Sequence, residues 1–271
     1  MSELSLSRAW EETRDIFAHD GGLLSAVTLA LLVFPEVIVG LITPAGVAMA
    51  PLGRIVWIVA GLIGILGQLA LVRLALGPST SVGEAIAHGA RRFPATLGAF
   101  LLLCLALGVI VIPLMLVLAL SGAVALPVEG RTPPPSFMVL AFAIMIGTLL
   151  IGVKFMLTIP ISAAEESGPL HILKRSWRVT AGHYWRLLAF LLLMIVTTIV
   201  LLIAAQSVGL IAGQAIGGRV VPLSLGALVL ALFQAVASAT MTALLTVMTA
   251  RFYVQLAGRG DAQASVPSSG I

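Results

Sequence analysis

The chain has 271 residues, of which 60% are hydrophobic and only 10% are charged. Soluble domains carry about 25% charged residues, so this composition excludes a soluble protein and indicates an integral membrane protein. The formal net charge is +4, but the cations lie in short segments between apolar runs. This distribution favours anionic lipid over nucleic acid as their partner. The single cysteine, Cys104, excludes an intrachain disulfide.

The N-terminal part of the chain predicts an amphipathic helix followed by two membrane-spanning helices. Residues 4–19 place apolar side chains on one face and charged side chains on the other. The apolar runs 22–42 and 54–76 are each long enough to cross about 30 Å of hydrocarbon as a helix. Gly61, Gly64 and Gly67 share one face of the second run, where they predict close packing against another helix.

The middle of the chain repeats this order. Residues 81–93 form a second amphipathic pattern, and the runs 94–122 and 137–159 predict the third and fourth spans. Pro113 predicts a kink in the third span. The intervening loop contains consecutive prolines and is expected to be extended.

The segment 165–186 is the longest polar interruption in the sequence. Leu170, Leu173 and Trp177 recur with helical spacing, and a basic stripe follows one position later. One apolar and one basic stripe are typical of a helix in the membrane interface, with its cations toward anionic headgroups. The segments 4–19, 81–93 and 165–186 are called elbows below, because each precedes a spanning helix. The runs 187–211 and 223–250 predict the last two spans, and residues 258–271 are expected to be disordered.

These elements predict an all-α polytopic bundle of six transmembrane helices with three amphipathic interfacial elbow helices. We expect one membrane domain over residues 1–257, built as a three-fold hairpin repeat of about 4–76, 78–159 and 165–256. Near its end, each repeat places a cation in apolar surroundings: Arg73, Lys154 and Arg251. These cations either extend to the headgroups or form a ring that binds lipid phosphate or pairs with Glu84, Glu165 and Glu166.

The distribution of basic residues predicts the orientation. Of the 15 Lys and Arg residues, all except Arg54, Arg131 and Arg219 fall on the side that holds the elbows and both termini. Because short cytoplasmic segments carry the excess of Lys and Arg, we expect this side to be cytoplasmic.

The elbows supply the candidate lipid-binding residues. Lys174, Arg175 and Arg178 lie within about one turn of each other, and Trp177 supplies an interfacial anchor. Arg91 and Arg92 are the corresponding cations of the second elbow. The expected partners are membrane lipids, in particular anionic ones.

The spans hold a second group of candidates. Glu36 lies within the first span, as a protonated or hydroxyl-bonded structural acid or as a proton or substrate site. A polar ridge with i+4 spacing in the last span either joins helices or lines a path: Gln234, Ser238, Thr242 and Thr246.

The sequence holds no metal-ligand spacing, no phosphate-binding loop and no nucleophile motif. We therefore expect a protein without catalytic residues, metal ions or cofactors. Two functions stay open. One is a lipid-binding or scaffolding membrane protein, and the other is a small transporter or channel with a polar path near Glu36.

The third elbow also carries a resemblance to a known family. The chain resembles the glycerophosphoryl diester phosphodiesterase membrane-domain family, which includes YciC-type bacterial inner-membrane proteins, in its six-span layout and in the run Ile172-Leu-Lys-Arg-Ser-Trp-Arg-Val-Thr-Ala-Gly-His-Tyr-Trp-Arg186. The resemblance implies a multi-pass protein of the bacterial cytoplasmic membrane. It covers the membrane domain alone, without the soluble phosphodiesterase domain.

Overall fold

The structure, a computed structural model, describes residues 5–44, 50–77, 81–125 and 132–264. All regular structure in these residues is helical. Six helical segments among them are long and apolar enough to cross a membrane: Leu6–Ile42, Pro51–Leu76, Val82–Leu120, Pro135–Ala164, Pro169–Gly217 and Leu225–Ala257. The predicted all-α class and the predicted number of apolar helices are therefore confirmed.

The first segment is a single bent rod. Ser5 caps α1 (Leu6–Thr28), which is followed by the π-helical turn η1 (Leu29–Val33) and by α2 (Phe34–Ile42). The first elbow is thus continuous with the first span, and only the non-helical backbone of Asp20 lies between them. Pro35 has no amide hydrogen for the carbonyl of Leu31, its partner in a regular α-helix, which accounts for the π-helical turn at this place.

The second elbow is also continuous with its span. After α3 (Pro51–Leu76), a capping box between Ser81 and Glu84 starts α4 (Val82–Leu120). This helix passes through both Pro94 and Pro113. Each proline removes one backbone hydrogen bond, yet the helix is continuous at both positions. The boundary expected at Pro94 is therefore not a helix end.

Around the third elbow, in contrast, the chain is divided into several short helical segments. α5 (Pro135–Phe155) is separated from the short helix α6 (Thr158–Ala164) by Met156 and Leu157. The break lies where Pro160 cannot donate to the carbonyl of Met156. α7 (Pro169–Thr180) follows, and the 3-10 turn η2 (Ala181–His183) separates it from α8 (Tyr184–Gly217).

The last helix, α9 (Leu225–Ala264), is longer than expected. It continues beyond residue 258, where the sequence predicts a disordered tail. Residues 265–271 lie outside the described part of the chain.

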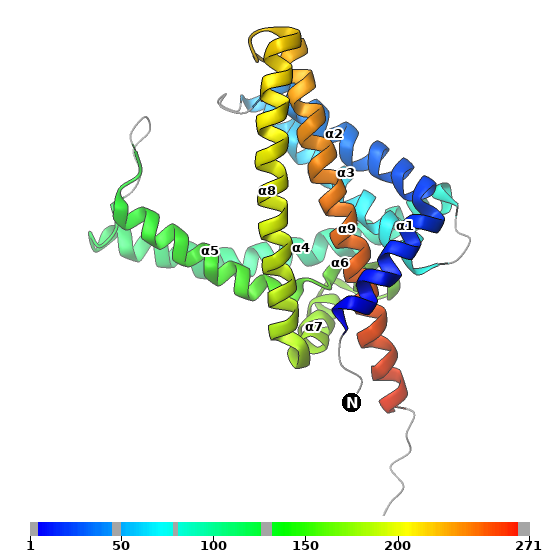
Figure 1. Cartoon of the computed structure of the whole chain (residues 1–271). Coiled ribbons are helices and arrows are strands. Elements are labelled where there is room, and N and C mark those ends of the chain that lie inside the picture. Colours follow the sequence, from blue (N-terminus) through cyan, green and yellow to red (C-terminus); the bar gives the residue numbers. More distant parts are fainter. Residues whose placement is uncertain (1–4, 45–49, 78–80, 126–131, 265–271) are drawn as a thin grey trace, which may run out of the picture.

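α9 is the helix around which the others pack, since it contacts α1, α2, α3, α6 and α8. Two clusters of buried apolar side chains share it, one with α1 and α3 and the other with α5, α7 and α8. In Figure 1, α8 and α9 form a long hairpin, while α4 and α5 project sideways from its lower part. The chain thus contains hairpins in the predicted order, but they differ in how they pack, and the three-fold repeat stays a prediction.

Candidate functional sites

The first candidate site is a groove beside α7, lined by a mixture of apolar and basic side chains. Its volume is about 520 Å³. It is referred to as the α7 groove, and its lining residues are Phe155, Leu173, Lys174, Trp177, Arg178 and Ala181. Two of the predicted lipid-binding cations, Lys174 and Arg178, therefore lie beside the predicted anchor Trp177.

Buried hydroxyl groups hold α7 in place against the end of α5. Ser176 and Thr180 are both fully buried, and their side chains donate to the carbonyl of Lys154 at 2.9 and 3.0 Å. Buried polar groups are expensive unless they are hydrogen-bonded, so these two bonds determine which face of α7 points inward. Leu170 and Trp177, which lie to the side of this inward face, are exposed.

Lys154 lies beside the aromatic side chains at the groove. Its ammonium group lies 5.2 Å from the ring centre of Trp177 and 5.0 Å from that of Tyr184. The rings of Phe155 and Trp177 are 5.7 Å apart. Lys154 is thus a predicted intramembrane cation that contributes positive charge next to the groove.

Arg175 has a different place from its two basic neighbours. Its Nε atom donates to Glu165 at 3.1 Å, and the Tyr253 hydroxyl donates to the same carboxylate oxygen at 2.9 Å. Both side chains of the Arg175–Glu165 pair are about three-quarters shielded. Arg175 therefore connects α7 to α9 instead of lining the groove.

The remaining basic candidates are spread over several environments. Arg92 forms an ion pair with Glu166, and Arg91 is exposed and donates to the carbonyl of Ala87. Arg251 donates to the carbonyl of Ala75 at 2.7 Å, while Arg73 is exposed in the last turn of α3. The carboxylates of Glu165 and Glu166 thus bind Arg175 and Arg92, and Glu84 caps its own helix, instead of pairing with a ring of Arg73, Lys154 and Arg251.

The second candidate site lies among the spanning helices. A cavity of about 310 Å³ opens between α2, α3 and α9 next to the π-helical turn. It is referred to as the Glu36 crevice, and its lining residues are Leu31, Leu32, Glu36, Val39, Trp57, Ala60, Gly61, Gly64, Gln68, Ala239 and Thr242. At its edge, the hydroxyl of Ser238 donates to the carboxylate of Glu36 at 2.8 Å.

The polar ridge of α9 is divided between two roles. Ser238 and Thr242 face the Glu36 crevice, whereas Gln234 donates to the side chain of Gln206 on α8. Thr246 is buried and donates to the carbonyl of Thr242 within the same helix. Gln234 thus joins α9 to α8, whereas Ser238 and Thr242 border the cavity.

Trp57, Gln68 and Gln206 are not among the residues predicted from the sequence. A signal for the two glutamines was present, since an amide in an apolar run has to find a partner or a cavity. Gln206 is bound by Gln234 of α9, and Gln68 borders a crevice that α2 and α9 also line. Helical spacing within one run contains no information about such neighbours from other helices.

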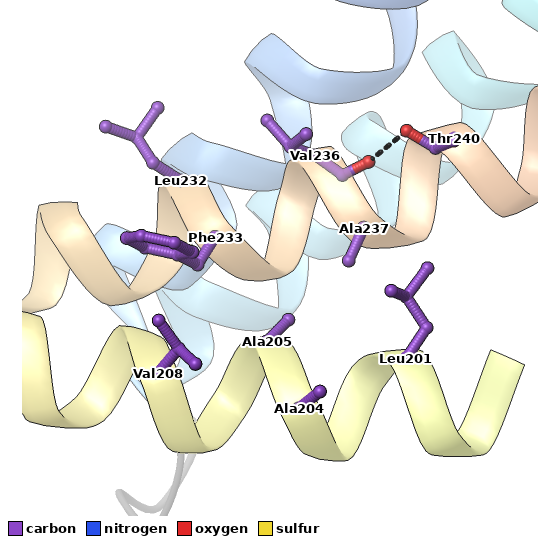
Figure 2. A pocket seen from close by; sticks show the side chains of 9 residues that line it. All are labelled: Leu201, Ala204, Ala205, Val208, Leu232, Phe233, Val236, Ala237 and Thr240. Carbon is purple, nitrogen blue, oxygen red and sulfur yellow. Dashed lines mark hydrogen bonds between the residues drawn. The ribbon is translucent and has the colours of Figure 1, made fainter.

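Figure 2 shows a third hollow, an apolar groove of about 530 Å³ between α8 and α9. The single hydroxyl in its lining, on Thr240, donates to the carbonyl of Val236 in its own helix. An acyl chain or an apolar side chain could therefore pack in this groove, but the groove would not recognise a polar group.

Within the described residues, no three His, Cys, Asp or Glu side chains gather at a place that could hold a metal ion. A search of curated proteins and a search of solved structures each found no match to the chain. A family model does match, over residues 13–256, which is most of the chain and all six apolar segments except the first turns of α1 and Ala257. The chain therefore belongs to the family described as "Domain of unknown function (DUF7847)".

Proposed function

We propose that this protein is a non-catalytic membrane protein of the bacterial inner membrane that binds anionic lipid at the α7 groove. The observation that carries this proposal is the composition of the groove. Lys174 and Arg178 lie beside Phe155, Leu173 and Trp177 in one hollow. An anionic phospholipid presents the matching chemistry, because a phosphate is joined to apolar chains in one molecule.

The amphipathic helices support an interfacial position for this groove. Trp10 in α1, Trp177 in α7 and Trp185 at the start of α8 are all exposed. Tryptophan is enriched where hydrocarbon meets water. The start of α1 and α7 lie near the same end of the α8–α9 hairpin (Figure 1). We place this end, with both termini, at the cytoplasmic face, and we assign the three elbows of the hairpin repeat to that interface.

The proposal assigns different tasks to the three cations of the elbow. Lys174 and Arg178 contact the headgroup, and Lys154 adds positive potential from beneath the Trp177 ring. Arg175 keeps α7 against α9 through Glu165 and makes no lipid contact.

The test compares two double variants of equal charge in nanodiscs. Lys174→Gln/Arg178→Gln removes both groove cations, and Arg54→Gln/Arg219→Gln removes two cations from the opposite side. Each cation near an anionic lipid contributes about 1 kcal/mol, so the groove variant should bind phosphatidylglycerol about 30-fold more weakly. The measurement is lipid retention by native mass spectrometry, in mixtures with phosphatidylcholine.

The control pair should retain phosphatidylglycerol as the parent protein does. Equal retention by the groove variant, with its helix content unchanged by circular dichroism, would reject the α7 groove as the lipid site. Equal loss in both double variants would show that total charge, and not the groove, attracts the lipid.

A further inference from the structure

The Glu36 crevice has an unusual set of polar groups for a membrane interior. Its lining contains one carboxylate, the amide of Gln68 and the hydroxyl of Thr242, and it contains no Lys, Arg or His. In the described part of the chain, the ion pairs involve other acids, and the partner of Glu36 is the Ser238 hydroxyl. A carboxylate in apolar surroundings costs several kcal/mol when it is ionised without a cation. The crevice therefore has room for a positive charge that the lining does not provide.

The size and the walls of the crevice indicate what kind of cation would fit. About 310 Å³ is at the lower end of the range of small-molecule sites and is far larger than a bare ion needs. The walls are mainly aliphatic, from Leu31, Leu32, Val39 and Ala60, and the indole of Trp57 stands among them. An aromatic ring attracts a cation over its face, and quaternary ammonium groups, which are weakly hydrated, are recognised by proteins in this way.

The backbone keeps this space open. At Gly61, no other part of the protein lies within 4 Å of the place where a Cβ would stand, and at Gly64 the nearest atom is a Leu32 methyl at 3.9 Å. Gly67, one turn further, is in close contact with Leu31, where a Cβ would approach to 2.9 Å. Of the three glycines on this face, one therefore packs the helices together, and the other two border the cavity.

The π-helical turn contributes to the same place. Leu31 and Leu32 belong to η1 and line the crevice directly before Glu36. Single π-helical turns inside α-helices occur frequently at functional sites, because they reorient side chains locally. Here the turn positions the apolar wall next to the carboxylate.

We propose that the Glu36 crevice binds a small organic ammonium ion, with the Glu36 carboxylate as its counter-ion and the Trp57 indole as its aromatic wall. Gln68 and Thr242 add an amide group and a hydroxyl group to the same lining. This site is independent of the α7 groove, which carries the opposite charge. A solute site within the membrane is also what the small-transporter alternative requires.

The experiment measures binding of radiolabelled benzyltrimethylammonium to the full-length protein in nanodiscs of phosphatidylcholine, a lipid without net charge. We expect saturable binding that is competed by unlabelled probe. Neopentylbenzene has the same shape with carbon in place of the charged nitrogen, and it should not compete. Competition by this neutral molecule at the same concentration would mean that the crevice recognises apolar shape and not charge, which would overturn the proposal.

Variants at three positions place the binding in the crevice. Glu36→Gln keeps an acceptor for Ser238 but removes the charge, and it should weaken binding at least tenfold. Trp57→Leu should weaken it about fivefold, and Trp57→Phe, which keeps an aromatic face, by less. Gly64→Val fills the cavity without changing any charge and should abolish binding.

Glu11→Gln is the matched control, since Glu11 is an exposed acid in the first elbow. It should bind the probe like the parent protein. Undiminished binding by folded Glu36→Gln, an equal loss in Glu11→Gln, or no saturable binding by the parent protein would each reject the site. If Glu36→Gln does not fold, Gly64→Val and the neutral competitor still decide the question.

Discussion

The α8–α9 and α4–α5 hairpins are both made of two long apolar helices, yet they pack in opposite ways. α8 and α9 approach closely: a Cβ on Gly213 would lie 2.6 Å from the carbonyl oxygen of Gly226, and one on Gly209 would lie 3.1 Å from the Leu230 side chain. The two helices are also joined by Gln206 and Gln234. By contrast, the α4–α5 hairpin projects from the molecule (Figure 1).

The outer part of the α4–α5 hairpin exposes its apolar side chains on most sides. Leu105 and Ile112 of α4 are 63% and 68% exposed, and Phe142 of α5 is 59% exposed. At Gly147 and Gly152 of α5, nothing lies within 4 Å of a Cβ position. Such surfaces are apolar enough to face acyl chains.

The difference shows what apolar composition does and does not determine in a membrane. Lipid tails are as apolar as leucine, so burial of leucine does not by itself bring two helices together. Small residues that admit close approach, and amides that need a partner, select the pair. α8 and α9 have both small residues and amides, at positions that face each other across the two helices. The outer part of the α4–α5 hairpin lacks this combination.

The largest expected effect comes from placing a methyl group where the backbones of α8 and α9 come into close contact. Gly213→Ala would place a methyl group against the Gly226 backbone, which cannot move aside as a flexible side chain can. We expect it to destabilise the protein by about 3 kcal/mol. The measurement is unfolding in mixed micelles with increasing dodecyl sulfate. Gly147→Ala, in the open hairpin, should instead be neutral or stabilise by up to about 1 kcal/mol, because alanine has the better helix propensity.

A smaller effect is expected from truncating a packed leucine. Leu230 is 2% exposed and lies against Gly209, so Leu230→Ala leaves a cavity between α8 and α9. We expect a loss of about 2 kcal/mol, at the low end for such changes, since lipid removes the transfer contribution. Leu105→Ala in α4 should change the unfolding free energy by less than about 0.5 kcal/mol. Equal losses in the two variants would contradict the contrast between the hairpins.

The smallest effect concerns the hydrogen bond between the two amides. Gln234→Leu leaves the side chain of Gln206 without this partner. Interhelical bonds of this kind contribute about 0.6 kcal/mol on average, so we expect a loss of about 1 kcal/mol or less. In the same unfolding assay, the double variant Gln206→Leu/Gln234→Leu should be more stable than Gln234→Leu alone. A double variant that is less stable than both single variants would show that the amides have separate partners.

The sequence by itself determined the class, the number of apolar helices and the amphipathic character of α7. These properties depend on the length and period of local apolar runs, and both can be read directly from the sequence. Glu36 within a span and the polar ridge of α9 are visible for the same reason. The continuation of both N-terminal elbows into their spans was not visible, because a polar-to-apolar change resembles a helix boundary even where the backbone does not break.

Only the tertiary structure decided which polar groups meet. Glu36 and Ser238 are more than two hundred positions apart in the chain, and Arg175 and Tyr253 both bind Glu165 from different helices. A helical period shows which side chains share a face but not which helix that face contacts. The same limit applies to the two sites. In the third elbow, Lys174 and Arg178 line the groove while Arg175 forms an inward ion pair. Trp57 and Gln68 lie with Glu36 around one crevice. Both arrangements result from packing between distant segments.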